Sequence, residues 1–387
     1  MFELRNIVIY IISQEDWGEM FISKHHYAVE LSKRGNKVFF INHPDQNHKL
    51  NRGEVRIEKT QYPDLYVVKH RMWIPYFLKY DYPKVYAFLV RFHMAYLARK
   101  IKFKPDLVWS FDLSNSLPFV GFNQAKRTLF MPVDTPHWEY SIQAANGAQV
   151  ILSVTQEILD KYTSFDVPRI FVNHGVSEAF VSQHIQTHSN HPIRVGYSGG
   201  LLRNEIDRPI LLDLIARNPE IQFEFWGEHD FDNAFISVAK NHDVATVKFI
   251  ESLKSHSNVV LHGVVHSSKL SQVLKQVDVL LTCYDINKDQ SGGTNYHKLL
   301  EYLATGKVVV STNVSTYSRL YPGYLNMLET RENNHGMAEL FETVVSHLDV
   351  YNSVENQQKR IAFAKQFLYS NQVNKIEEIL ANLSPRH

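Results

Sequence analysis

The chain has 387 residues, of which 44% are hydrophobic and 21% are charged, an ordinary globular composition that argues against a disordered protein. Its 41 Lys and Arg residues nearly balance its 40 Asp and Glu residues, so the overall basic excess typical of a nucleic-acid-binding protein is absent. A chain of this length predicts two domains rather than one.

Two features predict the compartment. The single cysteine, Cys283, excludes an internal disulfide and fits a reducing environment. The apolar run at residues 7–12 is too short for a membrane-spanning helix, and no small-residue cleavage site follows it. We therefore expect a cytoplasmic protein.

In the first half of the chain, apolar β-branched runs alternate with segments of helical period, which predicts βαβ units and a parallel sheet. The predicted strands are 6–12, 37–42, 106–112, 128–134, 149–154 and 169–175, and the predicted helices are 21–34 and 83–102. The segments at 53–60 and 65–70 add further strands, as an inserted hairpin or as a sheet edge.

A polar, aperiodic segment at 181–192 indicates a linker, after which the pattern restarts. Further strands are predicted at 193–199, 221–227, 258–265, 278–284 and 307–312, with helices at about 208–217, 267–276 and 295–304 and a helical tail at 353–384.

The predicted fold class is therefore α/β, with two tandem Rossmann-like doubly wound domains. The N-terminal domain would span 1–185 and the C-terminal domain 192–352, and C-terminal helices at 353–387 would return to the N-terminal domain. Ligands of such sheets bind beyond the carboxyl ends of the strands, which predicts a site in a cleft between the domains.

The segment "SGGTNYHKLLEYLATGKVVVST" at 291–312 combines a glycine-rich loop, a short helix and a strand. Gly292 and Gly293 would let a ligand approach the backbone, and the N–H groups of the first helical turn would form an anion site. Thr294 or Asn295 would cap the helix. This arrangement predicts binding of a phosphate group.

Glu301 stands in the middle of that helix, four residues after His297 and therefore on the same face. A carboxylate at this distance from a phosphate-binding helix start could bind neighbouring hydroxyls, as acidic residues bind ribose in other nucleotide sites. Alternatively, Glu301 is a solvated helix residue that pairs with Lys298.

From Asn295 onward this segment, written N-x-x-K-L-L-E-Y-L-A-T-G-K-V-V-V-S-T, resembles the donor-site segment of retaining GT-B glycosyltransferases of the family 4 type. Those enzymes hold the ribose of a nucleotide sugar through the glutamate, while the helix N-terminus faces the diphosphate. The resemblance implies that Glu301 binds ribose. It also implies that the rest of the donor is held by Ser291, Gly292, Gly293, Thr294, Asn295, Lys298, Gly200 and Arg203.

Two other segments resemble the same enzymes. Residues 17–42 are similar to the N-terminal helix and strand of teichuronic-acid-type surface-polysaccharide glycosyltransferases, with Trp17, His25 and His26 matching on the acceptor side. Residues 193–207 resemble the start of their C-terminal domain, where a glycine-rich turn and a basic residue help to bind phosphate. The resemblance implies a UDP- or GDP-sugar as donor substrate, no cofactor besides it, no metal, and a glycan or lipid-linked acceptor.

Two positions depart from the family pattern. Gly293 stands where the family often carries the first acid of an E-x7-E motif, so backbone amides would have to replace that contact. Ser23 and Lys24 replace an Arg-Pro pair that often precedes the two histidines. The missing acid keeps two alternatives open, a non-catalytic GT-B binding or scaffold protein and a nucleotide-sugar epimerase.

Candidate catalytic residues follow two strands of the first domain. Asp112 and Asp134 each end a predicted strand, so either could orient an acceptor hydroxyl, or could only cap a turn. His137 follows Asp134 closely and shares both interpretations. Arg203 follows a Gly-Gly turn in the second domain and could neutralise a leaving diphosphate without a metal, or could be a surface residue.

Two patterns have the spacing of metal sites. Asp230 and Asp232 could bind a divalent cation, and His184, His188 and His191 could bind zinc. An acidic turn and a polar linker account for them in a chain of two tandem domains. We therefore expect no metal.

Residues 69–104 carry nine Lys and Arg against one acid, Asp81, with ten aromatic residues among them. Helical spacing places the following side chains on one face: Val85, Phe88, Leu89, Phe92 and Tyr96. A basic, aromatic amphipathic helix of this kind fits an anionic membrane surface, which would place the protein at the inner face of the cell membrane. Alternatively, this face packs into the core of the first domain.

Overall fold

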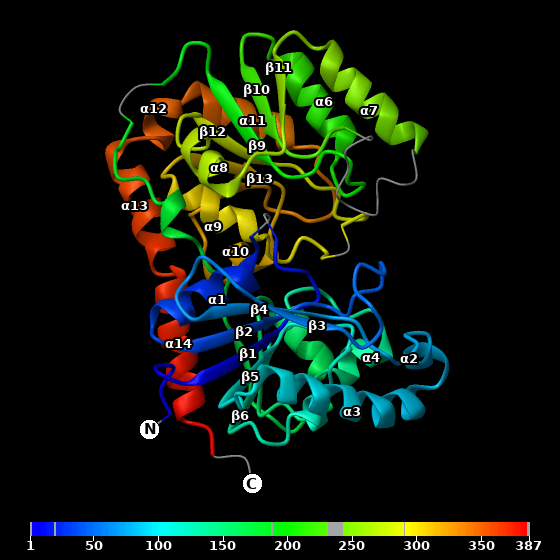
Figure 1. The fold of residues 1–387 in the computed structure, drawn as a ribbon. Coiled ribbons are helices and arrows are strands. Elements are labelled where there is room, and N and C mark those ends of the chain that lie inside the picture. Colours follow the sequence, from blue (N-terminus) through cyan, green and yellow to red (C-terminus); the bar gives the residue numbers. More distant parts are fainter. Residues whose placement is uncertain (1, 19–20, 187–188, 231–242, 290, 385–387) are drawn as a thin grey trace. The chain divides into compact units, whose positions relative to one another are not determined.

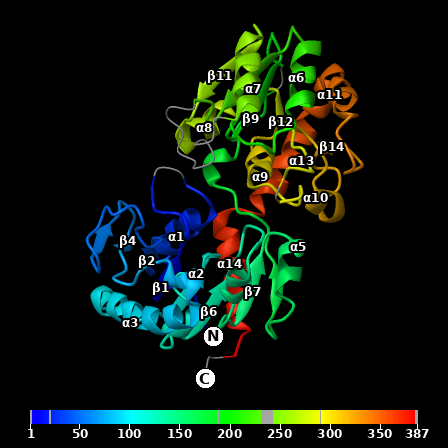
Figure 2. The ribbon, with the colours of Figure 1, turned by 90° about the vertical axis from the view of Figure 1, so that its right-hand side faces the viewer.

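The structure, a computed structural model, describes residues 2–18, 21–186, 189–230, 243–289 and 291–384 (Figures 1 and 2). The chain forms two compact units, the first made of Met1–His174 with Tyr369–His387 and the second of Gly175–Leu368. Each unit is built on a sheet of its own and has its own hydrophobic core.

The first unit contains an eight-stranded sheet with the order β3-β4-β2-β1-β5-β6-β7-β8. Neighbouring strands run parallel, except that β3 pairs antiparallel with β4 at one edge. The strands are β1 (Val8–Ile12), β2 (Lys37–Ile41), β3 (Val55–Lys59), β4 (Leu65–His70), β5 (Leu107–Ser110), β6 (Arg127–Phe130), β7 (Val150–Ser153) and β8 (Arg169–Phe171). The helices are α1 (Ser23–Lys33), α2 (Leu78–Asp81), α3 (Pro83–Ile101), α4 (Glu139–Gln143), α5 (Gln156–Leu159) and α14 (Tyr369–Ala381), with 3₁₀ turns η1 (Phe119–Gly121) and η2 (Asp160–Tyr162).

The central strands of this sheet, β1, β2 and β5, are buried at almost every position, as a parallel sheet covered on both faces requires. The C-terminal helix α14 lies beside α1 in this unit (Figure 1). The ring of Tyr369 stacks on His26 with 4.7 Å between centroids, and Val373 and Ile376 are fully buried in the core of the unit. The last helix of the chain therefore completes the first unit.

The second unit contains a six-stranded sheet with the order β11-β10-β9-β12-β13-β14, in which every neighbouring pair is parallel. The strands are β9 (Arg194–Ser198), β10 (Gln222–Trp226), β11 (Val259–Gly263), β12 (Val279–Thr282), β13 (Val308–Ser311) and β14 (Asn326–Met327). The helices are α6 (Arg208–Arg217), α7 (Val244–Ser255), α8 (Ser267–Val273), α9 (His297–Ala304), α10 (Ser315–Leu320), α11 (Met337–Ser346), α12 (Leu348–Tyr351) and α13 (Val354–Lys365), with a 3₁₀ turn η3 (Glu178–Phe180).

The C-terminal end of helix α9 is fixed by packing. Leu299, Leu300 and Leu303 are fully buried on its inner face. Gly306 follows with a φ of +84°, a left-handed conformation that suits glycine after a helix. Helix α13 packs against α9, and a Cβ atom on Gly306 would lie only 3.0 Å from the side chain of Ile361. The helix that carries Glu301 is therefore held firmly in its unit.

The structural boundaries differ from the expected domain limits. Residues 175–186, expected in the first domain or the linker, belong to the second unit: Ser182 donates a backbone hydrogen bond to Ala304 at 2.9 Å, and the backbone oxygen of Gln186 accepts one from Gln357 at 2.7 Å. Helix α13 also belongs to the second unit, so only α14 of the expected C-terminal helices lies in the first. Hydrogen bonds can hold a polar segment against a domain as firmly as apolar contacts do. The polar character of the linker segment therefore did not mark the true boundary between the two units.

Candidate functional site

The expected donor-binding residues all lie in the second unit, at the carboxyl ends of adjacent strands. Strand β9 ends at Ser198 and is followed by Gly199 and Gly200, while β12 ends at Thr282 and leads into the loop that precedes α9. Since β9 and β12 are parallel neighbours, both loops leave the sheet at the same edge. The two glycine-rich segments recognised in the sequence therefore belong to one region.

Lys298 connects these two segments. Its ammonium group donates hydrogen bonds to the backbone oxygen of Ser198 and to the hydroxyl of Tyr284, the latter at 2.7 Å, and it lies 4.4 Å from the ring centroid of Tyr197. Gly199 has a φ of +139°, which favours glycine, and a Cβ atom there would stand 2.7 Å from the Lys298 Nζ atom at the flexible end of that side chain. The structure thus brings Lys298 to the turn after β9.

Glu301 lies one turn further along α9, with 14% of its side chain exposed. Its Oε1 atom is 3.6 Å from Nδ1 of His297, the residue expected on the same face. Burial raises the pKa of Glu301, and the neighbouring His297 and Lys298 act in the opposite direction. The alternative pairing with Lys298 is not found among the described residues, because Ser198 and Tyr284 hold the lysine ammonium.

The glycine-rich loop is organised by an acid that the sequence analysis missed. The carboxylate of Asp289 accepts hydrogen bonds from the backbone N–H groups of Ser291 at 2.9 Å and Gly293 at 2.8 Å, from the Ser291 hydroxyl and from the Tyr296 hydroxyl. The amides of Ser291 and Gly293 were expected to face a phosphate, but they already bind a carboxylate.

The expected helix cap also differs. The residue that precedes α9 is Tyr296, and its side chain makes no capping hydrogen bond. Thr294 instead donates from its hydroxyl to the Ser291 oxygen at 2.9 Å, within the loop, and Asn295 is buried. The loop therefore closes on itself before the helix begins, a local alternative that threonine side chains readily offer.

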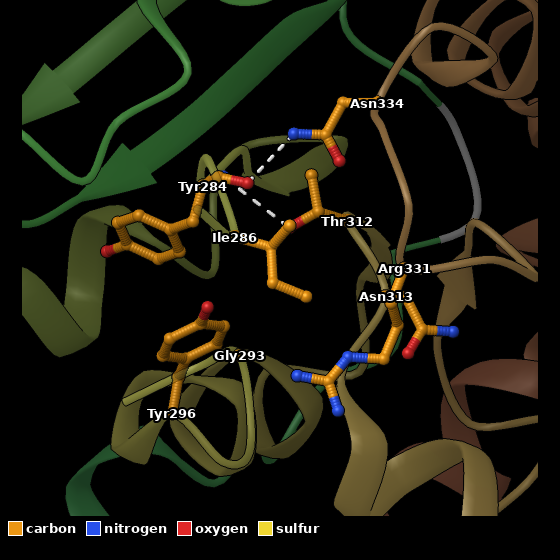
Figure 3. Close-up of a pocket in the computed structure, with 8 residues that line it drawn as sticks. All are labelled: Tyr284, Ile286, Gly293, Tyr296, Thr312, Asn313, Arg331 and Asn334. Atoms are coloured by element: carbon orange, nitrogen blue, oxygen red, sulfur yellow. Dashed lines mark hydrogen bonds between the residues drawn. The ribbon is translucent and has the colours of Figure 1, made fainter. Parts of the chain in front are cut away.

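A small pocket lies beside this loop (Figure 3). It is lined by Tyr284, Ile286, Gly293, Tyr296, Thr312, Asn313, Arg331 and Asn334. Several of these residues directly follow β12 and β13, so the pocket opens at the carboxyl ends of the strands. Arg331 comes from the loop after β14, a strand of only two residues that no sequence pattern revealed.

Arg203 and Gly200 occupy the turn after β9 as expected, but Arg203 is not directed at a buried site. Its side chain is 55% exposed and its Nη2 atom lies 3.4 Å from Glu205. This agrees with the surface alternative stated for Arg203. Lys298 is therefore the cation that the structure places against the glycine turn.

In the first unit, the expected catalytic residues follow the adjacent parallel strands β5 and β6, so they share one edge of the sheet. Asp112 is 2% exposed, and its carboxylate accepts hydrogen bonds from the backbone N–H groups of Ser114 and Ser116, both at 2.8 Å, and from the Ser116 hydroxyl. This agrees with the turn-forming alternative. Asp134 and His137 are exposed in the loop after β6.

Burial by itself would raise the pKa of the Asp112 carboxyl. Hydrogen bonds from Ser114 and Ser116, together with the electrostatic influence of His43 and Lys79, outweigh burial and lower the pKa below its ordinary value. Asp112 is therefore ionised, which suits an acceptor of hydrogen bonds rather than a proton donor.

A polar cluster missed by the sequence analysis lies near Asp112. The hydroxyl of Tyr76 lies 3.0 Å from Nε2 of His43 and 3.1 Å from the ammonium of Lys79. Lys79 is 6% exposed, and burial lowers its pKa to about 8 although the nearby Asp112 acts to raise it. Sequence analysis counted Lys79 as one more surface charge of the basic segment, because its burial depends on residues from other segments.

The residues expected on the acceptor side are packed into the first unit. His25 is fully buried and stacks on Phe40 with 4.9 Å between centroids. Its Nδ1 atom accepts from the Ile22 backbone N–H at 3.2 Å and its Nε2 atom lies 3.1 Å from the Asp16 oxygen, so both ring nitrogens are used. Burial lowers the pKa of His25 to about 4. The structure thus gives His25 a structural role.

Trp17 and His26 also contact aromatic residues of the first unit. Trp17 is half-buried against the core, with its ring centroid 5.1 Å from Phe40, and His26 stacks on Tyr369 of α14. Trp17 and His26 therefore contribute to the packing of the first unit.

The aromatic face expected on residues 83–102 is exposed. On α3 the exposed side chains are Val85, Phe88, Phe92 and Tyr96, whereas Leu89 is half-buried. The opposite face packs into the core through Tyr86, Val90, His93, Met94, Leu97 and Ile101. The alternative in which the first face packs into the core is therefore wrong, because a second apolar stripe on the same helix does so.

The two metal patterns lie partly outside the described residues, which omit His188 and Asp232. Among the residues that the structure does describe, no three His, Cys, Asp or Glu side chains gather as they would around a metal ion. The described helices also include none with the length and apolar character needed to cross a membrane.

Comparison with solved structures places this geometry among known folds. Sucrose-phosphate synthase from Thermosynechococcus elongatus matches with a TM-score of 0.67 at 12% identity, over 96% of this chain and 98% of that chain. HepE from Anabaena, solved in complex with UDP-glucose, matches with a TM-score of 0.64 at 14% identity, over 97% and 100%. The lipopolysaccharide outer core galactosyltransferase WaaB matches with a TM-score of 0.61 at 17% identity, over 97% and 100%. No family model and no curated protein sequence matches the chain.

At these identities the likeness shows the fold. The chain has the GT-B fold, and the expected α/β class with two parallel-sheet domains is confirmed.

Proposed function

We propose that this protein is a retaining glycosyltransferase of the family 4 type, which moves a sugar from a UDP- or GDP-sugar to a growing polysaccharide or a lipid-linked acceptor. The observation that carries the proposal is the start of helix α9. There Lys298 lies against the glycine turn after β9, and Glu301 follows one turn later. In a GT-B fold this is a cation and an acid suited to the diphosphate and the ribose of one nucleotide.

Glu301 would accept hydrogen bonds from the ribose hydroxyls. His297, its ion-pair partner among the described residues, is 3.6 Å away and so beyond an ordinary hydrogen bond. Both carboxylate oxygens can therefore accept from a ligand. Because Glu301 is largely buried, such hydrogen bonds would be stronger than on an open surface.

Lys298 would bind the diphosphate. An ammonium group has three donors, and the two that bind Ser198 and Tyr284 leave one for a phosphate oxygen. The positive charge would stabilise the negative charge that develops on the nucleoside diphosphate as it leaves.

In the proposed reaction, the bond between the anomeric carbon of the sugar and the diphosphate oxygen breaks. The oxygen of an acceptor hydroxyl bonds to the same carbon from the same face, and the hydroxyl proton passes to the departing diphosphate. Retention, and catalysis without a metal, come from the family resemblance. Asp134 and His137, exposed at the carboxyl edge of the first sheet, are better placed to meet an acceptor than the buried Asp112.

The acceptor class is supported by the exposed face of α3. Four apolar side chains on that face, with the basic residues around them, would let a cytoplasmic protein rest on the anionic inner face of a membrane. A lipid-linked acceptor would be presented at such a surface.

Calorimetric titration of the protein with UDP- and GDP-sugars tests the proposed donor site. We expect one nucleotide class to bind, and the Glu301→Ala variant to weaken its binding by about tenfold or more, because a hydrogen bond to a charged group contributes roughly 1.5–3 kcal/mol. The matched control is Glu342→Ala, which changes an exposed glutamate of α11 and should leave binding unchanged.

Three other outcomes separate the alternatives. Binding of no nucleotide at all would overturn the proposal. Binding without transfer to any glycan or lipid-linked acceptor would favour a non-catalytic binding protein. Conversion of the donor alone into an isomeric nucleotide sugar would favour an epimerase.

A further inference from the structure

The pocket beside the glycine-rich loop contains a cation that nothing in the described part of the chain neutralises. Arg331 makes no hydrogen bond and no ion pair with any described residue, and its Nε atom is buried without an acceptor. Figure 3 shows its guanidinium group pointing across the pocket toward Tyr296 and Gly293. Arg331 is half-buried, and a guanidinium that is partly withdrawn from water without a partner is unfavourable, so this position suits an anion.

A second polar group of the same pocket also lacks a partner. Asn313 is 6% exposed, and its amide nitrogen donates to the oxygens of Leu328 at 2.7 Å and Glu329 at 3.1 Å. Its Oδ1 atom is buried and accepts no hydrogen bond from the described residues. An unused acceptor therefore accompanies the unused cation, and a ligand that satisfies both must carry an anionic group and a donor such as a hydroxyl.

Two acids near the pocket are already engaged elsewhere. Asp289 accepts hydrogen bonds from Ser291, Gly293 and Tyr296, as described above. Asp207 accepts from the side chain of Asn334 at 2.7 Å and caps helix α6. Neither forms an ion pair with Arg331, so the charge of the guanidinium remains available.

Gly293 keeps the space in front of Arg331 open. A Cβ atom at this position would stand 3.3 Å from the Asn313 backbone oxygen, 3.4 Å from the Tyr296 hydroxyl and 3.5 Å from Nη2 of Arg331. The backbone φ of +64° also disfavours any side chain. An acid at position 293 would lie against the guanidinium and cancel its charge, whereas glycine leaves that charge to a ligand.

The size of the pocket indicates which part of a ligand it holds. The space inside the pocket is small, so it suits a single charged group of a ligand rather than a whole ring. The pocket adjoins the donor site, because Tyr284 both lines it and accepts the hydrogen bond from Lys298. The sugar of a nucleotide sugar is the part of the donor that would extend from the diphosphate toward this space.

Resting on the proposed function, we propose that the donor sugar is a uronic acid and that the charged end of this sugar enters the pocket. Its carboxylate is bound by the guanidinium of Arg331, whose fork of N–H groups matches a carboxylate. A ring hydroxyl donates to Oδ1 of Asn313. A neutral hexose would satisfy Asn313 but would leave the Arg331 charge unpaired.

Matched donors that differ only at carbon 6 test this inference. We would measure, by calorimetry, the dissociation constants of UDP-glucose against UDP-glucuronate and of GDP-mannose against GDP-mannuronate, together with UDP and GDP alone. The wild type should bind the uronate of one pair about tenfold or more tightly than its neutral partner, since charge-assisted hydrogen bonds are worth roughly 1.5–3 kcal/mol. Arg331→Gln should abolish this preference and leave binding of the nucleoside diphosphate unchanged.

Two controls keep the result specific. Arg217→Gln changes an exposed arginine of the same unit, paired with Asp213 at 2.8 Å, and should preserve the preference. Arg331→Lys keeps the positive charge but loses the planar pair of N–H groups that matches a carboxylate. This variant should reduce the preference for the uronate donor without abolishing it.

The inference is overturned if neutral sugars bind as tightly as uronates, or if Arg331→Gln changes nothing. It is also overturned if that variant weakens UDP or GDP alone to the same extent as their sugars, because Arg331 would then bind phosphate. In each of these cases the proposed glycosyltransferase function stands. Failure of every nucleotide to bind would remove the proposed function as well.

Discussion

The ammonium group of Lys298 lies 2.7 Å from the hydroxyl of Tyr284 and also donates to the backbone oxygen of Ser198. One side chain near the start of α9 thereby joins the loops that follow β9 and β12. These loops are far apart in the sequence, and we propose that the donor diphosphate binds at their junction.

Replacing Lys298 with methionine should therefore weaken nucleotide binding. The variant keeps most of the side-chain volume but loses the charge and its hydrogen bonds, so the dissociation constant for UDP or GDP should rise by about tenfold or more. Calorimetric titration measures this change. Lys288→Met, which alters an exposed lysine of the same unit, is the control and should bind as the wild type does. Equal affinity of the Lys298→Met variant would show that the diphosphate binds elsewhere.

Asp289 should be needed for the shape of the glycine-rich loop. Asp289→Ala leaves the N–H groups of Ser291 and Gly293 and the hydroxyl of Tyr296 without their acceptor. Each unsatisfied buried group costs about 1–3 kcal/mol, although water can reach part of this loop. We expect the free energy of unfolding of the second unit to fall by about 1–3 kcal/mol in urea denaturation.

The control for this change is Asp213→Ala, which alters a largely exposed acid on α6. Its effect should stay within about 0.5 kcal/mol. If Asp289→Ala proves as stable as this control, the carboxylate does not organise the loop.

The buried Lys79 should make the stability of the first unit depend on pH. Its pKa is about 8 in the folded protein, well below its value in an unfolded chain, so the unfolded state binds more protons between these two values. The unfavourable burial of the charge is complete below pH 8 and is relieved as the pH rises above it. Lys79→Met should therefore raise the free energy of unfolding at pH 7, and this gain should shrink at alkaline pH.

The gain at pH 7 should be on the order of 1–2 kcal/mol, because lost contacts with Tyr76 and the rings around the ammonium offset part of the desolvation. Urea denaturation of both proteins between pH 7 and pH 10 measures the difference. Lys84→Met changes an exposed lysine of α3 and should show no such trend. A difference between Lys79→Met and wild type that does not vary with pH would contradict the prediction.

The exposed face of α3 should bind anionic membranes. Phe88 is 59% exposed and Phe92 is 56% exposed, with 5.3 Å between their ring centroids. Replacing both with serine should reduce co-sedimentation with vesicles that contain phosphatidylserine, and reversing the charges of Lys100, Lys102 and Lys104 should do the same.

Vesicles of phosphatidylcholine alone provide the control. These vesicles carry no net charge and therefore do not attract the basic residues of the protein. Substituting Val350, an exposed apolar residue of the second unit, with serine should have no effect on sedimentation. Equal sedimentation of wild type and variants, or none by the wild type, would show that this face serves another purpose.

The sequence predicted the strands of both sheets well, apart from the short β14. Runs such as those of β1 and β12 are apolar at nearly every position, and burial on both faces of a parallel sheet leaves this signature in the residues themselves. Several helices, including α7 and α11, were not predicted. The exposed face of α3 was recognised as amphipathic, but periodicity could not say which of its two apolar stripes is buried.

What the sequence by itself determined is the position of most strands along the chain, the tandem α/β architecture, and the segment in which Lys298 and Glu301 stand on one short helix. These follow from local spacing, which each segment carries within itself. Only the tertiary structure decided that Asp289 occupies the loop amides, that His25 is part of the core, and that Arg331 faces Gly293. These relationships depend on which loops meet at the carboxyl ends of neighbouring strands, and strand order is set by packing of the whole sheet rather than by any one segment.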